Sequence, residues 1–270
     1  MAAWLRRNLV VIVGWLVMVY ILVPNLVVTV FSFNDPRGQF NYEWNRFSLD
    51  AWLHPCASTG MCQALGLSLW VAVASAAVST VIGTAAAFAL GRYRFRGRAA
   101  TNLLVFFPMA TPEVVMGSSL LTLFISMGVP TGQTTILIAH ILFTLSFVVT
   151  TVKARVASLD PALEQAAADL YATPAQAFWK VTFPLVAPGI AAGALLAFAL
   201  SFDDFIVTNF NAGATPVTFP RYVWGAAQRG TPVQINVVGT VMFFGALAIV
   251  GIGQAIGARV RLQSRRKEAP

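Results

Sequence analysis

Three acidic residues lie inside apolar stretches of the sequence, where an ionised carboxylate is costly. Glu113 directly follows a proline, and Asp203 and Asp204 are neighbours in a long apolar run. A charged side chain at the centre of a membrane costs ~2.5–3.5 kcal/mol on insertion scales. No Lys or Arg lies in any of the apolar runs. We therefore expect these carboxylates to be compensated by water, by another subunit or by a cationic cargo.

Four polar residues near the two aspartates share a spacing that suits one face of a helix. Positions i, i+3, i+7 and i+10 lie on the same side of a continuous helix. The residues of this predicted polar stripe are Ser201, Asp204, Thr208 and Asn211. Asp203 is turned by ~100° from the stripe, because successive helical residues rotate by that angle. We predict that the stripe and Asp203 line a substrate path. The alternative is that the aspartate pair caps a helix at the outer boundary or bonds to another subunit.

Two further features of the apolar runs bear on this path. Pro108 and Pro112 predict a break in the run that contains Glu113. Broken helices near the membrane midplane are typical of transport sites, so we add Glu113 to the predicted path. His140, in the following run, is expected to form a hydrogen bond between helices rather than to relay protons.

The composition excludes several classes of protein. Of the 270 residues, 57% are hydrophobic and 10% are charged, and the mean hydropathy is +0.73. Soluble domains have ~25% charged residues, so neither a soluble globular protein nor a disordered chain fits. Two His and two Cys cannot complete a zinc or iron–sulfur site. No Gly-Lys-Ser or Gly-Lys-Thr forms a phosphate loop. We expect no catalytic residue, no metal and no cofactor.

Six apolar runs are long enough to cross a membrane, which takes ~20 residues of helix. The runs are 9–33, 64–90, 103–127, 135–152, 188–210 and 235–258. They predict an all-α polytopic membrane protein with six transmembrane helices. If both termini are cytoplasmic, 14 of the 18 basic residues lie on the inner side, as the positive-inside rule requires. The net charge of +8 therefore indicates topology and contact with lipid headgroups rather than nucleic-acid binding.

The runs and loops predict three parts. Residues 1–63 form a transmembrane helix and an outer loop, residues 64–260 form a core, and residues 261–270 form a basic cytoplasmic tail. Cys56 and Cys62 in the outer loop form either a disulfide or two inert thiols. Small residues at every fourth position of three runs predict close helix packing. These residues are Ser75, Ser79, Gly83, Ala87; Gly189, Gly193, Ala197, Ser201; and Gly253, Gly257.

The longest inner loop, residues 153–183, carries two helix-start signals. Asp160 precedes a proline and is expected to cap a first helix. Thr173 is followed by a proline and then by Gln176 at the third position, which forms a capping box for a second helix. We expect Pro184 to end this second helix and Pro188 to open the fifth span. The loop is therefore predicted to be a structured helical hairpin.

This hairpin resembles the cytoplasmic signature loop in the permease subunits of binding-protein-dependent ABC importers. That signature reads Glu-Ala-Ala, three residues, Gly, and an apolar-x-Leu-Pro segment about nine residues on. Gln165-Ala166-Ala167 takes the first place here, Tyr171 takes the Gly place, and Val181-Thr182-Phe183-Pro184 takes the last. Two positions differ, Gln for Glu and Tyr for Gly, and Glu164 is the acidic residue next to the first of them. The resemblance implies the type I ABC importer permease fold.

The same resemblance implies that the loop is a coupling helix seated in a groove of a separate ATPase subunit. The residues it would use are Asp160, Leu163, Glu164, Gln165, Ala166, Ala167, Asp169, Leu170, Tyr171 and Ala172. The implied partners are two ATPase subunits, a second homologous permease subunit and an extracytoplasmic substrate-binding protein. The implied location is the bacterial plasma membrane, and ATP hydrolysis would belong to the ATPase subunits.

Two further segments resemble spermidine/putrescine permease subunits. They are SFDDFIVTNF at 201–210 and PEVVMGSSLL at 112–121. Polyamines are linear polycations, and carboxylates along a path would replace their hydration. The lack of basic groups in the runs argues against an anionic cargo. Two alternatives stay open: the same machine with ferric iron, thiamine or an opine-like amine as cargo, and an ion-coupled secondary transporter, although no inverted repeat is visible.

Overall fold

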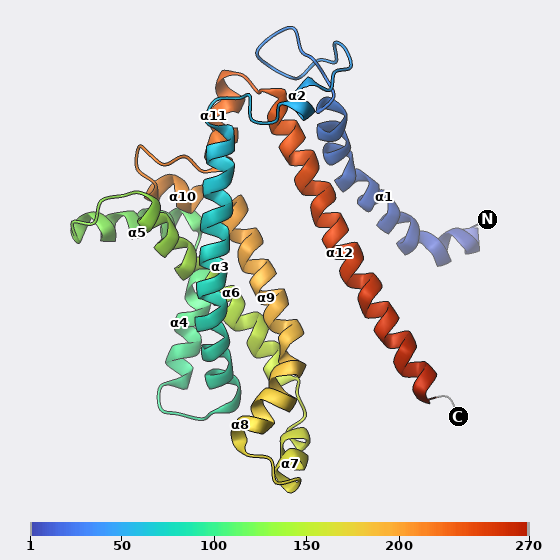
Figure 1. The fold of residues 1–270 in the computed structure, drawn as a ribbon, viewed down its shortest axis with the longest axis vertical. Helices are drawn as coiled ribbons and strands as arrows, with labels where there is room; N and C mark the ends of the chain where they lie inside the picture. The colour runs from blue at the N-terminus through green and yellow to red at the C-terminus, as the bar shows by residue number, and fades with distance from the viewer. Residues whose placement is uncertain (1, 269–270) are drawn as a thin grey trace. The chain divides into compact units, whose positions relative to one another are not determined.

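A computed structural model describes the backbone of residues 2–268 and the side chains of residues 8–254. Its regular elements are helices, with one isolated bridge between Asn34 and Phe47 (Figure 1). The chain divides into two compact units, Met1–Cys62 with Val223–Pro270, and Gln63–Tyr222. Two predicted features lie outside the residues whose side chains are described. They are the basic tail, 261–270, and Gly257 of one small-residue stripe.

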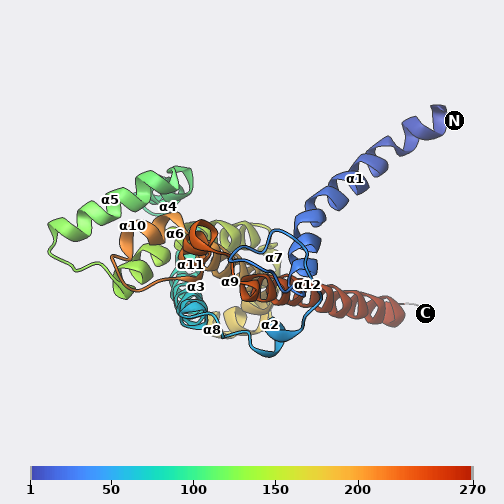
Figure 2. The same ribbon diagram turned by 90° about the horizontal axis from the view of Figure 1, so that it is seen from above.

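The first unit pairs the first and last long helices of the chain. Its helices are α1 (Ala2–Phe31), α2 (Asp50–Leu53) and α12 (Val233–Glu268). α1 packs along α12, and α2 lies against the start of α12, where Ala51, Val233 and Val237 form a small core. The two long helices are close together near α2 and separate toward the chain ends (Figures 1 and 2). Most apolar side chains of α1 are exposed, as expected for a helix in contact with lipid.

The outer loop of this unit is fixed by local contacts. Asn34 donates from Nδ2 to Asn41 Oδ1 at 2.7 Å. The Trp52 ring stacks on Phe33 with centroids 5.2 Å apart. The sulfurs of Cys56 and Cys62 are joined in a disulfide. The loop is therefore an ordered segment rather than a free connector.

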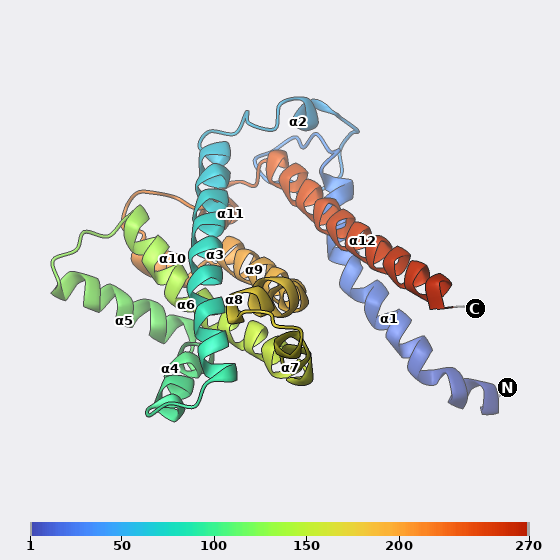
Figure 3. The same ribbon diagram turned by 60° about the horizontal axis from the view of Figure 1, so that its bottom comes forward.

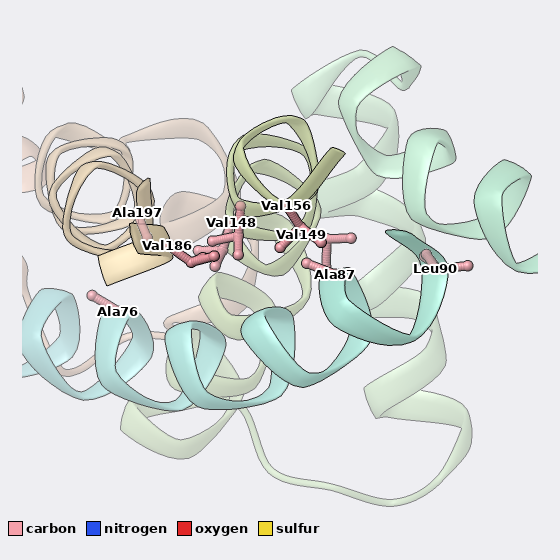
Figure 4. Packing of buried hydrophobic residues seen from close by; sticks show 9 residues of the cluster. Ala76, Ala87, Leu90, Val148, Val149, Val156, Val186 and Ala197 are labelled. Atoms are coloured by element: carbon pink, nitrogen blue, oxygen red, sulfur yellow. The ribbon is translucent and has the colours of Figure 1, made fainter. Parts of the chain in front are cut away.

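The second unit holds the remaining long helices. Its elements are α3 (Met61–Arg92), α4 (Arg98–Ala110), α5 (Glu113–Ser126), α6 (Gln133–Ala157), α7 (Ala162–Asp169), α8 (Pro174–Ala177), the π-helical turn η1 (Phe178–Thr182), α9 (Phe183–Asp203), α10 (Ile206–Asn211) and the start of α11 (Phe219–Arg229). Helices α6 and α9 pack along each other, and α3 runs beside them (Figures 1 and 3). Buried Val, Ala and Leu side chains of α3, α6 and α9 fill the space between them (Figure 4).

Close packing in this core depends on small residues. A Cβ added to Gly83 of α3 would lie 2.8 Å from a methyl group of Val148 on α6. A Cβ added to Gly189 of α9 would lie 2.7 Å from Arg155 Cβ. The predicted small-residue packing of the second and fifth runs is therefore confirmed. Gly253 of α12 has no neighbour within 4 Å among the described residues, so its predicted packing role stays a prediction.

Five helices are long and apolar enough to cross a membrane, and a sixth span results if the bent pair α4 and α5 counts as one. The bend between these two helices is 108° and lies at Pro112, as predicted. The prediction that Pro108 also breaks the run is wrong, because Pro108 lies inside α4. Helix α4 ends because Thr111 is extended, and Pro112 then precedes the first residue of α5. The prediction of an all-α polytopic protein is confirmed, with five spans, or six when the broken third run is counted as one.

The prediction that Pro184 ends a helix and Pro188 opens the fifth span is wrong. The helical path runs from Pro174 to Asp203 without a break. In η1 the N–H of Phe183 bonds to the carbonyl of Phe178, five residues earlier. A π-turn is wider than an α-turn, and it gives the ring of Pro184 room that a regular helix would not.

Candidate functional site: the acidic break and the helical hairpin

Asp204 marks a second break in the membrane helices. Its backbone is extended, with φ −63° and ψ 122°, so α9 ends at Asp203. Asp204 Oδ2 accepts from the backbone N–H of Thr208 at 2.7 Å and from Thr208 Oγ1 at 2.8 Å, and Oδ1 accepts from the Val207 N–H at 3.2 Å. These bonds cap α10 and compete with continuation of the helix. The prediction of one continuous helix through 188–210 is therefore wrong.

Residues of the predicted polar stripe nonetheless lie close together, around His140 of α6. His140 Nδ1 lies 2.7 Å from Ser201 Oγ, and Nε2 lies 2.9 Å from Thr208 Oγ1. Nε2 is also 3.2 Å from Asp204 Oδ2, and the side chains of this pair are 1% and 3% exposed. The predicted interhelical hydrogen bond of His140 is confirmed. The expectation that Asp204 finds its partner outside the chain is wrong, because His140 of the neighbouring helix α6 lies within hydrogen-bond distance of it.

The same network extends to helices α3 and α5. Ser75 Oγ of α3 donates to Ser201 Oγ at 2.9 Å. Asn211 Nδ2 donates to the carbonyl of Val207 at 2.8 Å and to that of Gly117 on α5 at 3.3 Å. The four stripe residues are buried. Their predicted role in lining a path stays a prediction, while their hydrogen bonds join five helices, α3, α5, α6, α9 and α10, around the break.

Two carboxylates remain exposed beside this buried network. Glu113 begins α5 at the first break, and Asp203 ends α9 at the second; both are exposed. As like charges, Glu113 and the aspartates at 203 and 204 repel rather than attract one another. Among the side chains of residues 8–254, no group of three His, Cys, Asp or Glu is arranged to hold a metal ion.

The hairpin of residues 153–183 has the predicted helix starts. Asp160 Oδ1 accepts from the backbone N–H of Ala162 at 2.9 Å, at the start of α7. Thr173 Oγ1 accepts from the Gln176 N–H at 3.3 Å, and Gln176 Oε1 accepts from the Thr173 N–H at 2.9 Å. The capping box is therefore confirmed.

Tyr171, at the Gly place of the signature, has a left-handed backbone with φ 57°. The N–H of Ala172 donates to the carbonyl of Ala167 at 3.0 Å, and the N–H of Tyr171 donates to that of Ala168 at 2.9 Å. This pair of bonds is a Schellman motif, which ends α7 in the way that a glycine would. The turn is kept although the glycine is absent.

The hairpin presents an exposed surface with apolar side chains. The exposed members of the predicted coupling set are Asp160, Leu163, Gln165, Ala166, Asp169, Leu170 and Tyr171. Glu164 and Ala172 are half-buried and Ala167 is buried. Trp179 of η1 is exposed beside this surface, and its ring contacts Phe178 and Phe183. The predicted coupling set omits Trp179, although an aromatic pair, Phe178 and Trp179, follows the second helix-start signal and was the available sign.

Comparisons with known proteins agree with this architecture. The family model described as "Binding-protein-dependent transport system inner membrane component" matches residues 79–268. "Spermidine/putrescine transport system permease protein PotC" of Escherichia coli (strain K12) is 35% identical over 237 residues, 88% of this chain and 89% of that protein. "Putrescine transport system permease protein PotI" of the same organism is 34% identical over 239 residues, 86% of this chain and 84% of that protein.

The fold is similar to that of a solved transporter. The match is to a chain in the crystal structure of a bacterial alginate ABC transporter in complex with an alginate pentasaccharide-bound periplasmic protein. The TM-score is 0.66 at 15% identity, over 96% of this chain and 98% of that chain. At this identity the likeness concerns the fold alone. The family match, the two relatives and the spans together show that this chain is a multi-pass permease subunit, a member of the family of inner membrane components of binding-protein-dependent transport systems.

Proposed function

We propose that this chain is a permease subunit of an ATP-driven importer that moves a polyamine, spermidine or putrescine, into the cell by alternating access. The names of the PotC and PotI relatives support this cargo. The observation that carries the proposal is the pair of exposed carboxylates, Glu113 and Asp203, each at a helix break. Both lie in the same compact unit.

The chemistry of this pair suits a linear polycation. An ammonium group that leaves water needs carboxylate or carbonyl oxygens in place of its hydration shell. Asp203 is the last residue of α9, where the unsatisfied carbonyls of the helix end carry partial negative charge and favour a cation. Asp204 is held by His140 and by the cap of α10, so it fixes the position of its exposed neighbour.

The hairpin formed by α7, α8 and η1 supplies the coupling to ATP hydrolysis in this proposal. Its exposed Leu163, Leu170 and Tyr171 offer apolar anchors for a groove on an ATPase subunit. Two ATPase subunits would act as a two-state motor, and a second permease subunit would complete the gate. An extracytoplasmic binding protein would deliver the cargo to the outer side. Both termini of this chain would be cytoplasmic.

Uptake of radiolabelled spermidine and putrescine in cells carrying the full importer tests the cargo path. Glu113→Gln and Asp203→Asn each remove one charge with little change in shape. We expect each to weaken uptake strongly, while Glu43→Gln, an exposed change in the outer loop, leaves it unchanged. Polyamine uptake at normal affinity in both variants would rule out the polycation path.

The same system separates the rival functions. Uptake of ferric iron, thiamine or an opine-like amine in place of a polyamine would indicate an importer of the same kind with a different cargo. If no ATPase subunit copurifies with the chain and an uncoupler alone abolishes uptake, the chain is an ion-coupled secondary transporter instead.

A further inference from the structure

One carboxylate of the hairpin contacts two other parts of the second unit. Glu164 of α7 forms an ion pair with Arg92, the last residue of α3, with Oε1 3.1 Å from Nη2. Arg92 Nη1 also donates to Glu164 Oε2 at 3.3 Å. Thr182 Oγ1 of η1 donates to Glu164 Oε1 at 2.6 Å. These three residues form what we call the Glu164 clamp, which joins α7 to α3 and to η1.

The clamp is partly shielded from water. The side chains of Arg92 and Glu164 are 22% and 39% exposed, and Thr182 is buried. Arg92 Nε is buried without a hydrogen-bond partner among the described residues. Removing Glu164 would therefore leave a shielded guanidinium without its counter-charge, which destabilises more than the loss of an exposed pair.

A second contact joins α3 and η1 beside the clamp. The rings of Phe88 on α3 and Phe178 on η1 meet edge to face, with centroids 5.3 Å apart. The clamp and this ring pair fix the end of α3 against η1, and η1 continues into α9. The hairpin therefore has a rigid attachment to two spans rather than a flexible one.

Gln165, which takes the Glu place of the signature, is in a different position. It lies ~100° further round α7 than Glu164, because successive helical residues rotate by that angle. It is exposed and neutral. In this chain the acidic group next to the signature thus faces the body of the permease, while the outward position carries an amide.

We propose that Glu164 is a positioning residue that transmits displacement of the hairpin to α3 and α9. The inference rests on the proposed coupling function of the hairpin. When the hairpin is displaced, the clamp makes the ends of both spans move with it. Without the clamp, the hairpin would move against the spans, and ATP would be hydrolysed with less transport.

The test uses the complete importer in proteoliposomes, where uptake and ATP hydrolysis are measured together. Glu164→Gln and Arg92→Gln are expected to keep the ATPase subunits bound while uptake per ATP falls about fivefold or more, in the usual range of coupling between sites. The exchanged pair Arg92→Glu with Glu164→Arg should restore much of the loss. Arg94→Gln, which removes an exposed charge two residues after Arg92, is the matched control and should behave as wild type.

Hydrogen exchange of the α7 amides in the purified chain tests the clamp without any ATPase subunit. Glu164→Gln should raise exchange across 162–169, and the exchanged pair should lower it again. Unchanged exchange, or unchanged uptake per ATP, would overturn the proposal. So would loss of ATPase binding in Glu164→Gln alone, which would make Glu164 a docking contact. If even the wild-type chain binds no ATPase subunit, the proposed function fails, and the exchange result still shows whether the clamp exists.

Discussion

Replacing Tyr171 by glycine should stabilise the end of the hairpin helix. The left-handed backbone at φ 57° costs an L-residue other than glycine ~1–2 kcal/mol. The Tyr171 side chain is 95% exposed, so its removal forfeits little packing. Glycine loses more backbone entropy on folding than tyrosine, by ~0.5–1 kcal/mol, and this offsets part of the gain. The net stabilisation expected for Tyr171→Gly is therefore ~1 kcal/mol.

Hydrogen exchange of the Schellman amides measures this directly. The N–H groups of Tyr171 and Ala172 close the turn, and their protection reports its opening free energy. A gain of ~1 kcal/mol corresponds to about fivefold slower exchange at the Ala172 amide. Tyr171→Ala is the matched control, since it removes the same ring but keeps the cost of the left-handed backbone. Equal protection in the alanine and glycine variants, or lower protection in the glycine variant, would refute the reasoning.

Three further changes test the packing and the caps. Gly83→Ala should destabilise the second unit by ~1–3 kcal/mol, because its methyl would lie 2.8 Å from a valine of α6; Gly66→Ala on the same helix, with nothing within 4 Å, should not. His140→Leu should lower the free energy of unfolding in detergent by ~1–3 kcal/mol, since it removes the imidazole that contacts Ser201, Thr208 and Asp204 and leaves Asp204 only its capping bonds, and a Tm equal to wild type would contradict the network. Thr173→Ala should cost ~1 kcal/mol by removal of the capping box, seen as faster exchange of the amide three residues on.

The sequence predicted correctly those elements that are decided by residues close together in the chain. Apolar length predicted the spans, because each span must satisfy its own backbone in lipid. Pro112 predicted the break before α5, and Thr173 with Gln176 predicted the capping box. Each of these features is decided by residues within a few positions of one another.

The wrong predictions concern contacts between residues distant in sequence or a rare local geometry. Asp204 finds His140 across 64 positions of the chain, and the period of the polar stripe cannot reveal that partner. The break at Asp204 follows from its own capping bonds, which compete with a helix that the apolar pattern favours. Pro184 fails to end a helix because the preceding π-turn accommodates it.

The unbroken helical path from Pro174 to Asp203 has a mechanical consequence. It contains 30 residues, so at ~1.5 Å per residue it is a rod ~45 Å long. One end carries the exposed hairpin surface and the other carries an exposed carboxylate. A tilt of only ~5° about the hairpin end would swing that carboxylate through an arc of ~4 Å over such a length. That distance exceeds the length of a hydrogen bond, so a small rocking motion at the hairpin end is enough to form or break a hydrogen bond at the other end of the helix.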